Sequence, residues 1–177
     1  LLAQECDAVD VSDPDFPSEV EIIKLPGHFF HMVGYRLPDG TVFMADCVSS
    51  PETLEKYQVG FIYDVAAYLA TLDAVREMSA NIFVPAHAEP CASMAELADI
   101  NKDKVLEIAE KIAGFCETPI VFESVLKRVF QEYGLTMDFA QYVLVGSTVR
   151  SYLSWLKDTG RLTVEFGDGE LLWKAIN

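Results

Sequence analysis

The chain has 177 residues, 51% of them hydrophobic, which is enough to bury one sizeable core or two small ones. Its net charge is −15, and residues 1–99 carry most of the excess, with 4 Lys and Arg against 17 Asp and Glu. A field of this sign repels phosphate backbones and argues against nucleic-acid binding. No apolar run reaches the ~18 residues of a membrane-spanning helix, and we expect neither a membrane segment nor a signal peptide.

The four cysteines, Cys6, Cys47, Cys91 and Cys116, are scattered along the chain. Because they form no Cys-x-x-Cys pair, they predict reduced thiols in a cytoplasmic protein rather than a disulfide framework. The chain begins with LLAQEC, which is typical of the last turn of a helix. We therefore expect the sequence to be a piece of a longer protein.

A loop and three strands are predicted in the first part of the chain. The polar stretch DAVDVSDPDFPSE contains two prolines and predicts a surface loop over residues 7–19. VEIIKL then predicts a short buried strand over residues 20–25. HMVGYRL and TVFMAD flank the turn Pro38-Asp39-Gly40, a pattern that is typical of a β-hairpin.

Two helices and a strand follow. The sequence Ser49-Ser50-Pro51 is a capping and first-turn signal for a short helix. Asp64 caps an amphipathic helix over residues 64–79, whose apolar residues recur at three- and four-residue steps. NIFVPAH, residues 81–87, predicts a short apolar strand. The order strand, hairpin, helix, strand predicts an α/β layer.

From about residue 94 the pattern changes to three helices and a second hairpin. The helices are predicted over residues 93–116, 118–134 and 138–160. Thr118-Pro119 opens the second helix and Gly134 closes it. RLTVEF and ELLWKAI flank Gly167-Asp168-Gly169, which is a strong hairpin signal.

Three helices followed by a hairpin is the order of a winged helix. We therefore predict two domains: an α/β domain over residues 1–98 and a small α+β winged-helix-like domain over residues 99–177. A winged helix that reads DNA is normally basic on its third helix and wing. Here the wing carries Glu165, Asp168 and Glu170, so nucleic-acid binding is the less favoured alternative.

Another alternative is a non-catalytic module that docks a partner or a second copy of the chain, which would make a homodimer. Its apolar surface would come from a set of large residues in the last part of the chain. These are Leu153, Trp155, Leu156, Leu171, Leu172 and Trp173. The simpler explanation, which we favour, is that they form the core of the module itself.

His28, Asp46 and His87 each lie where a predicted strand ends. His28 follows Pro26-Gly27, His87 follows Pro85-Ala86, and Asp46 closes TVFMAD. Functional sites in α/β sheets usually lie at such strand ends. Two imidazoles and a carboxylate suit a borderline ion such as zinc, and also iron or manganese.

Each candidate also has a structural explanation. A lone histidine near a strand end is usually a satisfied polar residue, and an aspartate there is more often a turn or cap residue. His31 would point to the opposite face of an extended strand from His28, which favours a core residue or a neighbour of the ligands. Asp64 most simply caps its helix, although it could hydrogen-bond a ligand histidine. Cys47 and Cys91 are interpreted as structural cysteines.

Three successive stretches resemble the second half of a metallo-β-lactamase domain: IIKLPGHFFHMVGYRLPDGTVFMADCVSS, YDVAAYLATLDAVREM and ANIFVPAHAEP. The resemblance covers roughly residues 18–91. That family carries a Pro-Gly-His turn, an aspartate at a later strand end and another histidine turn near the end of the domain. The resemblance implies the C-terminal half of an αββα sandwich. It also implies that His28 completes a first metal position, Asp46 bridges two metals and His87 binds the second.

The sequence departs from the family in ways that matter. The first metal motif, His-x-His-x-Asp-His, is absent, and alanine stands at Ala45 and Ala86 where glycine is commoner. The absent motif supplies most ligands and the acidic residue that orients the attacking water. We therefore assign no catalytic side chain here and expect the chain alone to be inactive.

For the intact protein, which would include the missing N-terminal half of the domain, the resemblance implies a hydrolase with two zinc ions. Its substrate would be an ester, thioester, lactone, β-lactam or phosphodiester.

Overall fold

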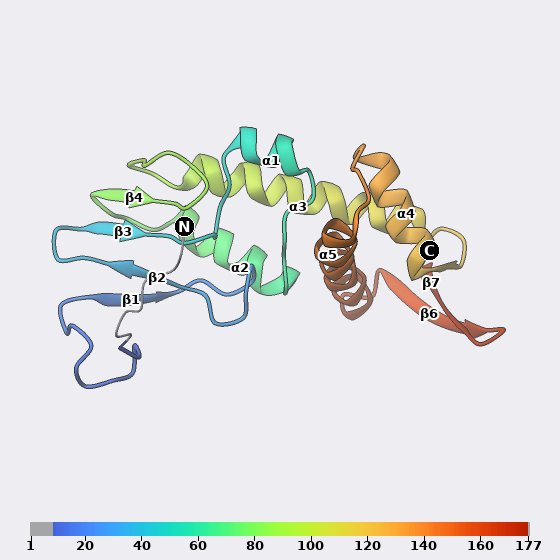
Figure 1. Ribbon diagram of the computed structural model, residues 1–177, viewed down its shortest axis with the longest axis horizontal. Helices are drawn as coiled ribbons and strands as arrows, with labels where there is room; N and C mark the ends of the chain where they lie inside the picture. Colours follow the sequence, from blue (N-terminus) through green and yellow to red (C-terminus); the bar gives the residue numbers. More distant parts are fainter. Residues whose placement is uncertain (1–8, 177) are drawn as a thin grey trace.

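The computed structural model describes residues 9–176 (Figure 1). The helical turn expected over residues 1–6, with Cys6, lies outside the described residues. Figure 1 shows a four-stranded sheet at one end of the molecule and the last two helices with a β-hairpin at the other end. A long helix, α3 (Ala95–Phe115), runs between the two ends.

The four-stranded sheet sets the direction of every strand that leads to a candidate site residue. Its strands are β1 (Glu21–Lys24), β2 (Val33–Arg36), β3 (Thr41–Phe43) and β4 (Ile82–Val84), in the spatial order β1-β2-β3-β4. β2 pairs antiparallel with both β1 and β3, whereas β3 and β4 pair parallel. β1, β3 and β4 therefore run in the same direction, and their carboxyl ends meet at one rim of the sheet.

The loop and the first hairpin are where the sequence predicted them. The described part of the loop forms turns, and Gly40 adopts a φ of 81° in the turn between β2 and β3. β1 differs from the prediction, because its residues are exposed or half-buried rather than buried. It lies at the edge of the sheet and has no neighbouring strand on its outer side among residues 9–176, so less of it is covered.

The first two helices begin at the predicted caps. In front of α1 (Pro51–Tyr57), the Ser50 hydroxyl accepts a hydrogen bond from the Thr53 amide at 3.3 Å. In front of α2 (Val65–Arg76), the Asp64 carboxylate accepts one from the Ala67 amide at 2.9 Å. Fully buried side chains of the sheet, α2 and α3 form one core; they include Val42, Met44, Leu72, Val75, Phe83 and Ala98.

The last part of the chain adds a three-stranded sheet to three helices. After α3 come β5 (Ile120–Val121), α4 (Phe122–Glu132), α5 (Phe139–Asp158), β6 (Leu162–Gly167) and β7 (Glu170–Ala175). The sheet order is β5-β7-β6, with antiparallel pairing. In the turn between β6 and β7 both Asp168 and Gly169 have positive φ, as a tight hairpin requires.

One element of this region was predicted wrongly. The helix expected from Thr118-Pro119 begins only at Phe122, because Ile120 and Val121 pair with Trp173 and Leu172 of β7. Of the six large apolar residues expected in the core of this region, Leu153 and Leu156 are fully buried, whereas Leu171 is 39% exposed and does not belong to the core. The others are half-buried: Trp155, Leu172 and Trp173. The winged-helix classification and the domain boundary at residues 98 and 99 stay predictions. None of the described helices combines the length and hydrophobicity that a bilayer crossing needs.

Candidate metal centre

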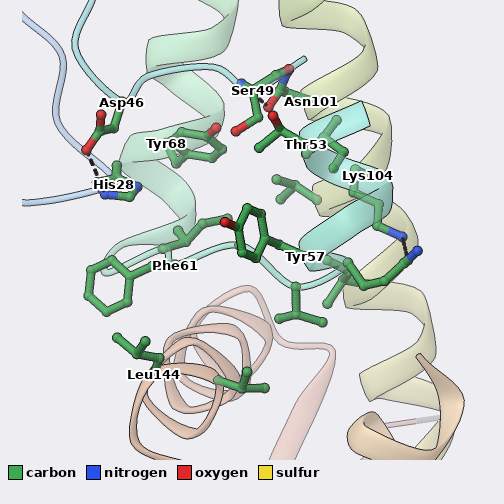
Figure 2. A pocket seen from close by; sticks show the side chains of 18 of the residues that line it. His28, Asp46, Ser49, Thr53, Tyr57, Phe61, Tyr68, Asn101, Lys104 and Leu144 are labelled. Atoms are coloured by element: carbon green, nitrogen blue, oxygen red, sulfur yellow. Dashed lines mark hydrogen bonds and ion pairs between the residues drawn. The ribbon is translucent and has the colours of Figure 1, made fainter. Parts of the chain in front are cut away.

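The strand directions bring His28, Asp46 and His87 to the same rim of the sheet. Asp46 lies three residues beyond β3 and His87 three residues beyond β4, while His28 follows β1. The Asp46 carboxylate lies between the two imidazoles: Oδ2 is 3.6 Å from Nε2 of His28, and Oδ1 is 3.3 Å from Nε2 of His87. Figure 2 shows the His28 and Asp46 side chains facing each other. The three residues singled out from the sequence are thus close together.

Backbone hydrogen bonds continue the parallel pairing of β3 and β4 into the segments that carry Asp46 and His87. The Ala86 amide donates to the Ala45 carbonyl at 3.0 Å, and the Ser50 amide donates to the His87 carbonyl at 2.8 Å. Ala45 adopts a φ of 48°, in the left-handed region. An alanine there costs about 1 kcal/mol, which these neighbouring bonds offset.

The turn before His28 packs against the N-terminal end of α2 and the two residues that precede it. The Gly27 carbonyl accepts hydrogen bonds from the amides of Tyr63 and Asp64, each at 3.0 Å. Gly27 has a φ of 126°, and a Cβ added there would lie 2.3 Å from the Cα of Tyr68. Glycine is therefore required at this position for both conformation and space.

The local environment favours a neutral imidazole at His28. Burial lowers the pKa of His28, and the nearby Asp46 carboxylate opposes this effect only in part. Side-chain exposure rises from 27% for His28 to 40% for Asp46 and 51% for His87, so the cluster opens toward solvent on the His87 side. Neutral imidazole is the form that binds metal ions.

The donors fit zinc in kind but not in number. Each oxygen of Asp46 faces a different imidazole, so this chain offers two donors at each of two positions. A zinc site normally has three or four protein ligands. Within residues 9–176, no three His, Cys, Asp or Glu side chains form a group that could enclose a metal ion. The described residues therefore make up part of a metal site at most.

The other residues that the sequence singled out take no part in these two contacts. His31 is exposed and packs edge-on against Phe30, with 4.8 Å between ring centroids, so it is not a core residue. Its alternative role as a neighbour of the ligands stays a prediction. Asp64 uses its carboxylate to cap α2. Cys47 is fully buried, and burial raises its pKa to about 12, which agrees with a structural cysteine.

Asn101 was missed by the sequence analysis. Its side chain on α3 is 1% exposed and forms two hydrogen bonds with the backbone of Ser49, in the segment that follows Asp46. Oδ1 accepts from the Ser49 amide at 3.0 Å, and Nδ2 donates to the Ser49 carbonyl at 2.8 Å. The signal was present, because Asn101 lies on the same helical stripe as the buried Val105 and Ile108. A polar residue on a buried stripe indicates a specific hydrogen-bonding role.

A cavity of about 300 Å³ opens beside the cluster. His28, Asp46 and His87 line one part of it, and the remaining walls come from Ser49, α1, the segment 58–62, Tyr68 of α2, α3 and α5. Figure 2 shows Tyr57 and Tyr68 projecting into this space from different elements, with Leu144 of α5 opposite. The cluster is therefore connected to a pocket large enough for a small ligand.

Comparison with known proteins gives a fold but no sequence family. No protein-family model matches the sequence, and neither does any curated protein. Several solved structures are similar, among them two crystal structures. One is a beta-lactamase domain protein from Burkholderia ambifaria, with a TM-score of 0.71 and 18% sequence identity. The match covers 98% of this chain and 52% of the Burkholderia chain. The other is a metallo-beta-lactamase family protein from Thermus thermophilus, with a TM-score of 0.69 and 14% sequence identity. The match covers 89% of this chain and 49% of the Thermus chain.

These comparisons define the class of the fold. The chain is a mixed α/β structure with the fold of metallo-β-lactamase-like proteins, as the sequence predicted. It spans about half the length of the structures that it matches. At 14% and 18% identity the similarity concerns the fold, and function has to be argued from the site.

Proposed function

We propose that this chain provides one half of a metal-dependent hydrolase. The observation that supports the proposal is the meeting of His28, Asp46 and His87 from the carboxyl ends of three strands that run in the same direction. Two imidazoles on either side of one carboxylate are a common donor set for zinc, iron or manganese. A group that served only folding would not need to lie half-exposed beside a cavity.

In the proposed centre, His28 would bind a first ion, His87 a second, and Asp46 would bridge them. The remaining ligands would come from a further segment, the N-terminal half of the domain, which agrees with the half-length match to the similar structures. A bound divalent ion supplies a water of lowered pKa and a positive charge beside the substrate's carbonyl or phosphoryl oxygen. The contribution of this chain is to hold the two imidazoles and the Asp46 carboxylate together at one rim of the sheet, with burial favouring the neutral form of His28.

Zinc titration by isothermal calorimetry tests the proposal on the chain itself. We expect weak binding by the unchanged chain, because each position has only two donors, and loss of that binding in Asp46→Ala. Asp39→Ala is the matched control, since Asp39 lies in the turn between β2 and β3, where it bonds to the Thr41 amide. Equal zinc binding by Asp46→Ala and the unchanged chain would contradict the assignment.

A second experiment joins the chain to the residues that complete the domain. Elemental analysis should then find about two metal ions per chain. Asp46→Ala should remove both the metal and the hydrolysis of a panel of ester, thioester, lactone and phosphodiester substrates. Full activity in that variant would contradict the proposed function.

The contacts of the last helix and hairpin do not favour nucleic-acid binding. The Arg150 guanidinium lies over the Phe122 ring, 3.4 Å from its centroid, and Lys174 pairs with Glu165 at 2.8 Å. These cations are thus engaged within the chain.

Three thiols, Cys47, Cys91 and Cys116, are free, which supports the cytoplasm as the proposed compartment.

A further inference from the structure

The side-chain amide of Asn101 pairs with the backbone of Ser49 as a neighbouring strand would. It accepts a hydrogen bond from the Ser49 amide and donates one to the Ser49 carbonyl, and Nδ2 also donates to the Leu97 carbonyl at 2.8 Å. Figure 2 shows Asn101 beside Ser49 at the upper edge of the pocket. Ser49 lies beyond the end of β3, so a side chain here makes the two backbone bonds that a strand partner makes within a sheet.

On its other side the same segment pairs with the backbone of His87. Ser49 and His87 lie side by side in a parallel bridge outside the named strands. The His87 carbonyl accepts hydrogen bonds from the Ser50 amide at 2.8 Å and from the Thr53 hydroxyl at 3.4 Å. Ser49 therefore connects the backbone of His87 to Asn101 on α3.

Packing alone would not require an amide at this position. Asn101 is the only asparagine or glutamine that is buried within residues 9–176. The buried residues Val105 and Ile108 on the same helical stripe are apolar. A buried amide loses its hydration, and this cost is offset only where its hydrogen bonds are made. The bonds of Asn101 thus indicate a specific requirement to hold Ser49 in place.

The turn that carries His28 is held by a different part of the molecule. The Gly27 carbonyl bonds to the amides of Tyr63 and Asp64, in front of α2, and none of the three side-chain bonds of Asn101 goes to this turn. Loss of the Asn101 amide should therefore disturb the neighbourhood of Ser49 and leave the bonds of the Gly27 turn intact.

We infer that Asn101 is a positioning residue of the candidate metal centre. It holds Ser49 against the backbone of His87 and thereby sets the separation of the Asp46 carboxylate from the His87 imidazole. These two side chains are 40% and 51% exposed, so packing does not fix their separation and the backbone that carries them has to. The role as a metal centre rests on the proposed function, whereas the geometry that Asn101 fixes is measurable without metal.

Zinc titration followed by proton NMR of the histidine rings tests this role, since the chain has only three histidines. Asn101→Leu keeps a branched side chain but lacks both polar groups, and half-saturation of the His87 signal should need about tenfold more zinc. Val129→Ala is the control for a general loss of stability, because Val129 is fully buried in α4, and it should leave the midpoint unchanged. An unchanged midpoint in Asn101→Leu, or an equal shift in both variants, would overturn the positioning role.

Amide hydrogen exchange of the metal-free chain tests the geometry directly. In the unchanged chain the Ser49 amide should exchange at least about a hundredfold more slowly than a free amide, because Asn101 accepts its hydrogen bond. This measurement needs no variant, so it applies even if Asn101→Leu fails to fold. Exchange of the Ser49 amide at the rate of a free amide would overturn the inference.

The same experiment on Asn101→Leu compares two amides. Exchange of the Ser50 amide, which bonds to the His87 carbonyl, should accelerate by about tenfold or more relative to the Asp64 amide in front of α2. An unchanged ratio of the two rates would contradict the role of Asn101. If exchange behaves as expected and zinc shifts no histidine signal of the unchanged chain, the positioning role stands and the hydrolase proposal fails.

Discussion

The turn that carries His28 leaves no room for a side chain, because a Cβ on Gly27 would lie 2.3 Å from the Cα of Tyr68. Neither atom can move aside without shifting the backbone of the turn or of α2. The positive φ of Gly27 adds a second constraint at the same residue. The approach of Gly27 to Tyr68 therefore fixes where His28 lies relative to the cavity.

Gly27→Ala should lower the free energy of unfolding by about 2 kcal/mol or more, because it combines a backbone clash with an unfavourable φ. Urea denaturation provides the measurement. Gly60→Ala is the matched control: Gly60 also lies near the cavity, but a Cβ there meets no atom within 4 Å and its φ is not positive. Similar losses in the two variants would show that the contact with Tyr68 is unimportant.

Two buried hydroxyls on α5 should respond in opposite ways to removal. Thr148 accepts a hydrogen bond from the Ile62 amide at 3.2 Å, whereas the Tyr152 hydroxyl has no partner among the described residues. Thr148→Val leaves the Ile62 amide unpaired and should cost about 1–3 kcal/mol. Tyr152→Phe removes a hydroxyl that gains nothing in the ligand-free chain, so the melting temperature should stay the same or rise. A lower melting temperature for Tyr152→Phe would show that the hydroxyl is paired in solution.

Asn101 should be a strong stability determinant, although it lies outside the candidate ligands. Its side chain makes three hydrogen bonds, two to Ser49 and one to the Leu97 carbonyl. Asn101→Ala should therefore lower the free energy of unfolding by about 2–3 kcal/mol. Asn81→Ala, at an exposed asparagine whose side chain donates one hydrogen bond to the Asp39 carbonyl, should cost less than about 1 kcal/mol. Chemical denaturation measures the loss in free energy of unfolding for each variant. Similar losses for the two variants would contradict the importance of the burial of Asn101.

The cysteines should react with iodoacetamide in an order set by burial. Cys91 is half-buried, whereas Cys116 is fully buried, and burial raises the pKa of Cys116 to about 11. The thiolate is the nucleophile, so at mildly alkaline pH Cys116 stays protonated and shielded while Cys91 is alkylated. Peptide mapping of timed samples measures the two rates separately. In denaturant the two rates should become similar, and equal rates in the folded chain would contradict the burial of Cys116.

Local signals predicted most elements correctly because those elements depend on nearby residues. Ser50 and Asp64 cap helices through bonds to amides three residues away, and the Asp168-Gly169 turn depends on its own backbone angles. β5 was missed for the opposite reason. Its pairing with β7 joins residues far apart in the chain, and this overrode the helix signal of Thr118-Pro119.

The candidate site was also predictable only where local sequence signals mark its residues. His28, Asp46 and His87 are recognisable because each follows a strand, and the strand directions then bring them together. Asn101 and Tyr152 had no such local signature. Their importance depends on what surrounds them after folding. Asn101 matters because it bonds to Ser49, and Tyr152 because its hydroxyl has no hydrogen-bond partner within the described chain. Only the polar identity of Asn101 on an otherwise apolar helical stripe gave a hint.

The continuity of α3 has a mechanical consequence. With 21 residues and no break, it extends for about 30 Å, contributes Asn101 near the cluster and packs against α4 and α5 further along. A rod of this kind has no hinge at its middle, so the sheet and the distal helices should move as one body. We therefore expect a ligand to enter through rearrangement of side chains and of the short connection between α1 and α2. A hinge motion that separates the four-stranded sheet from α4 and α5 is not expected.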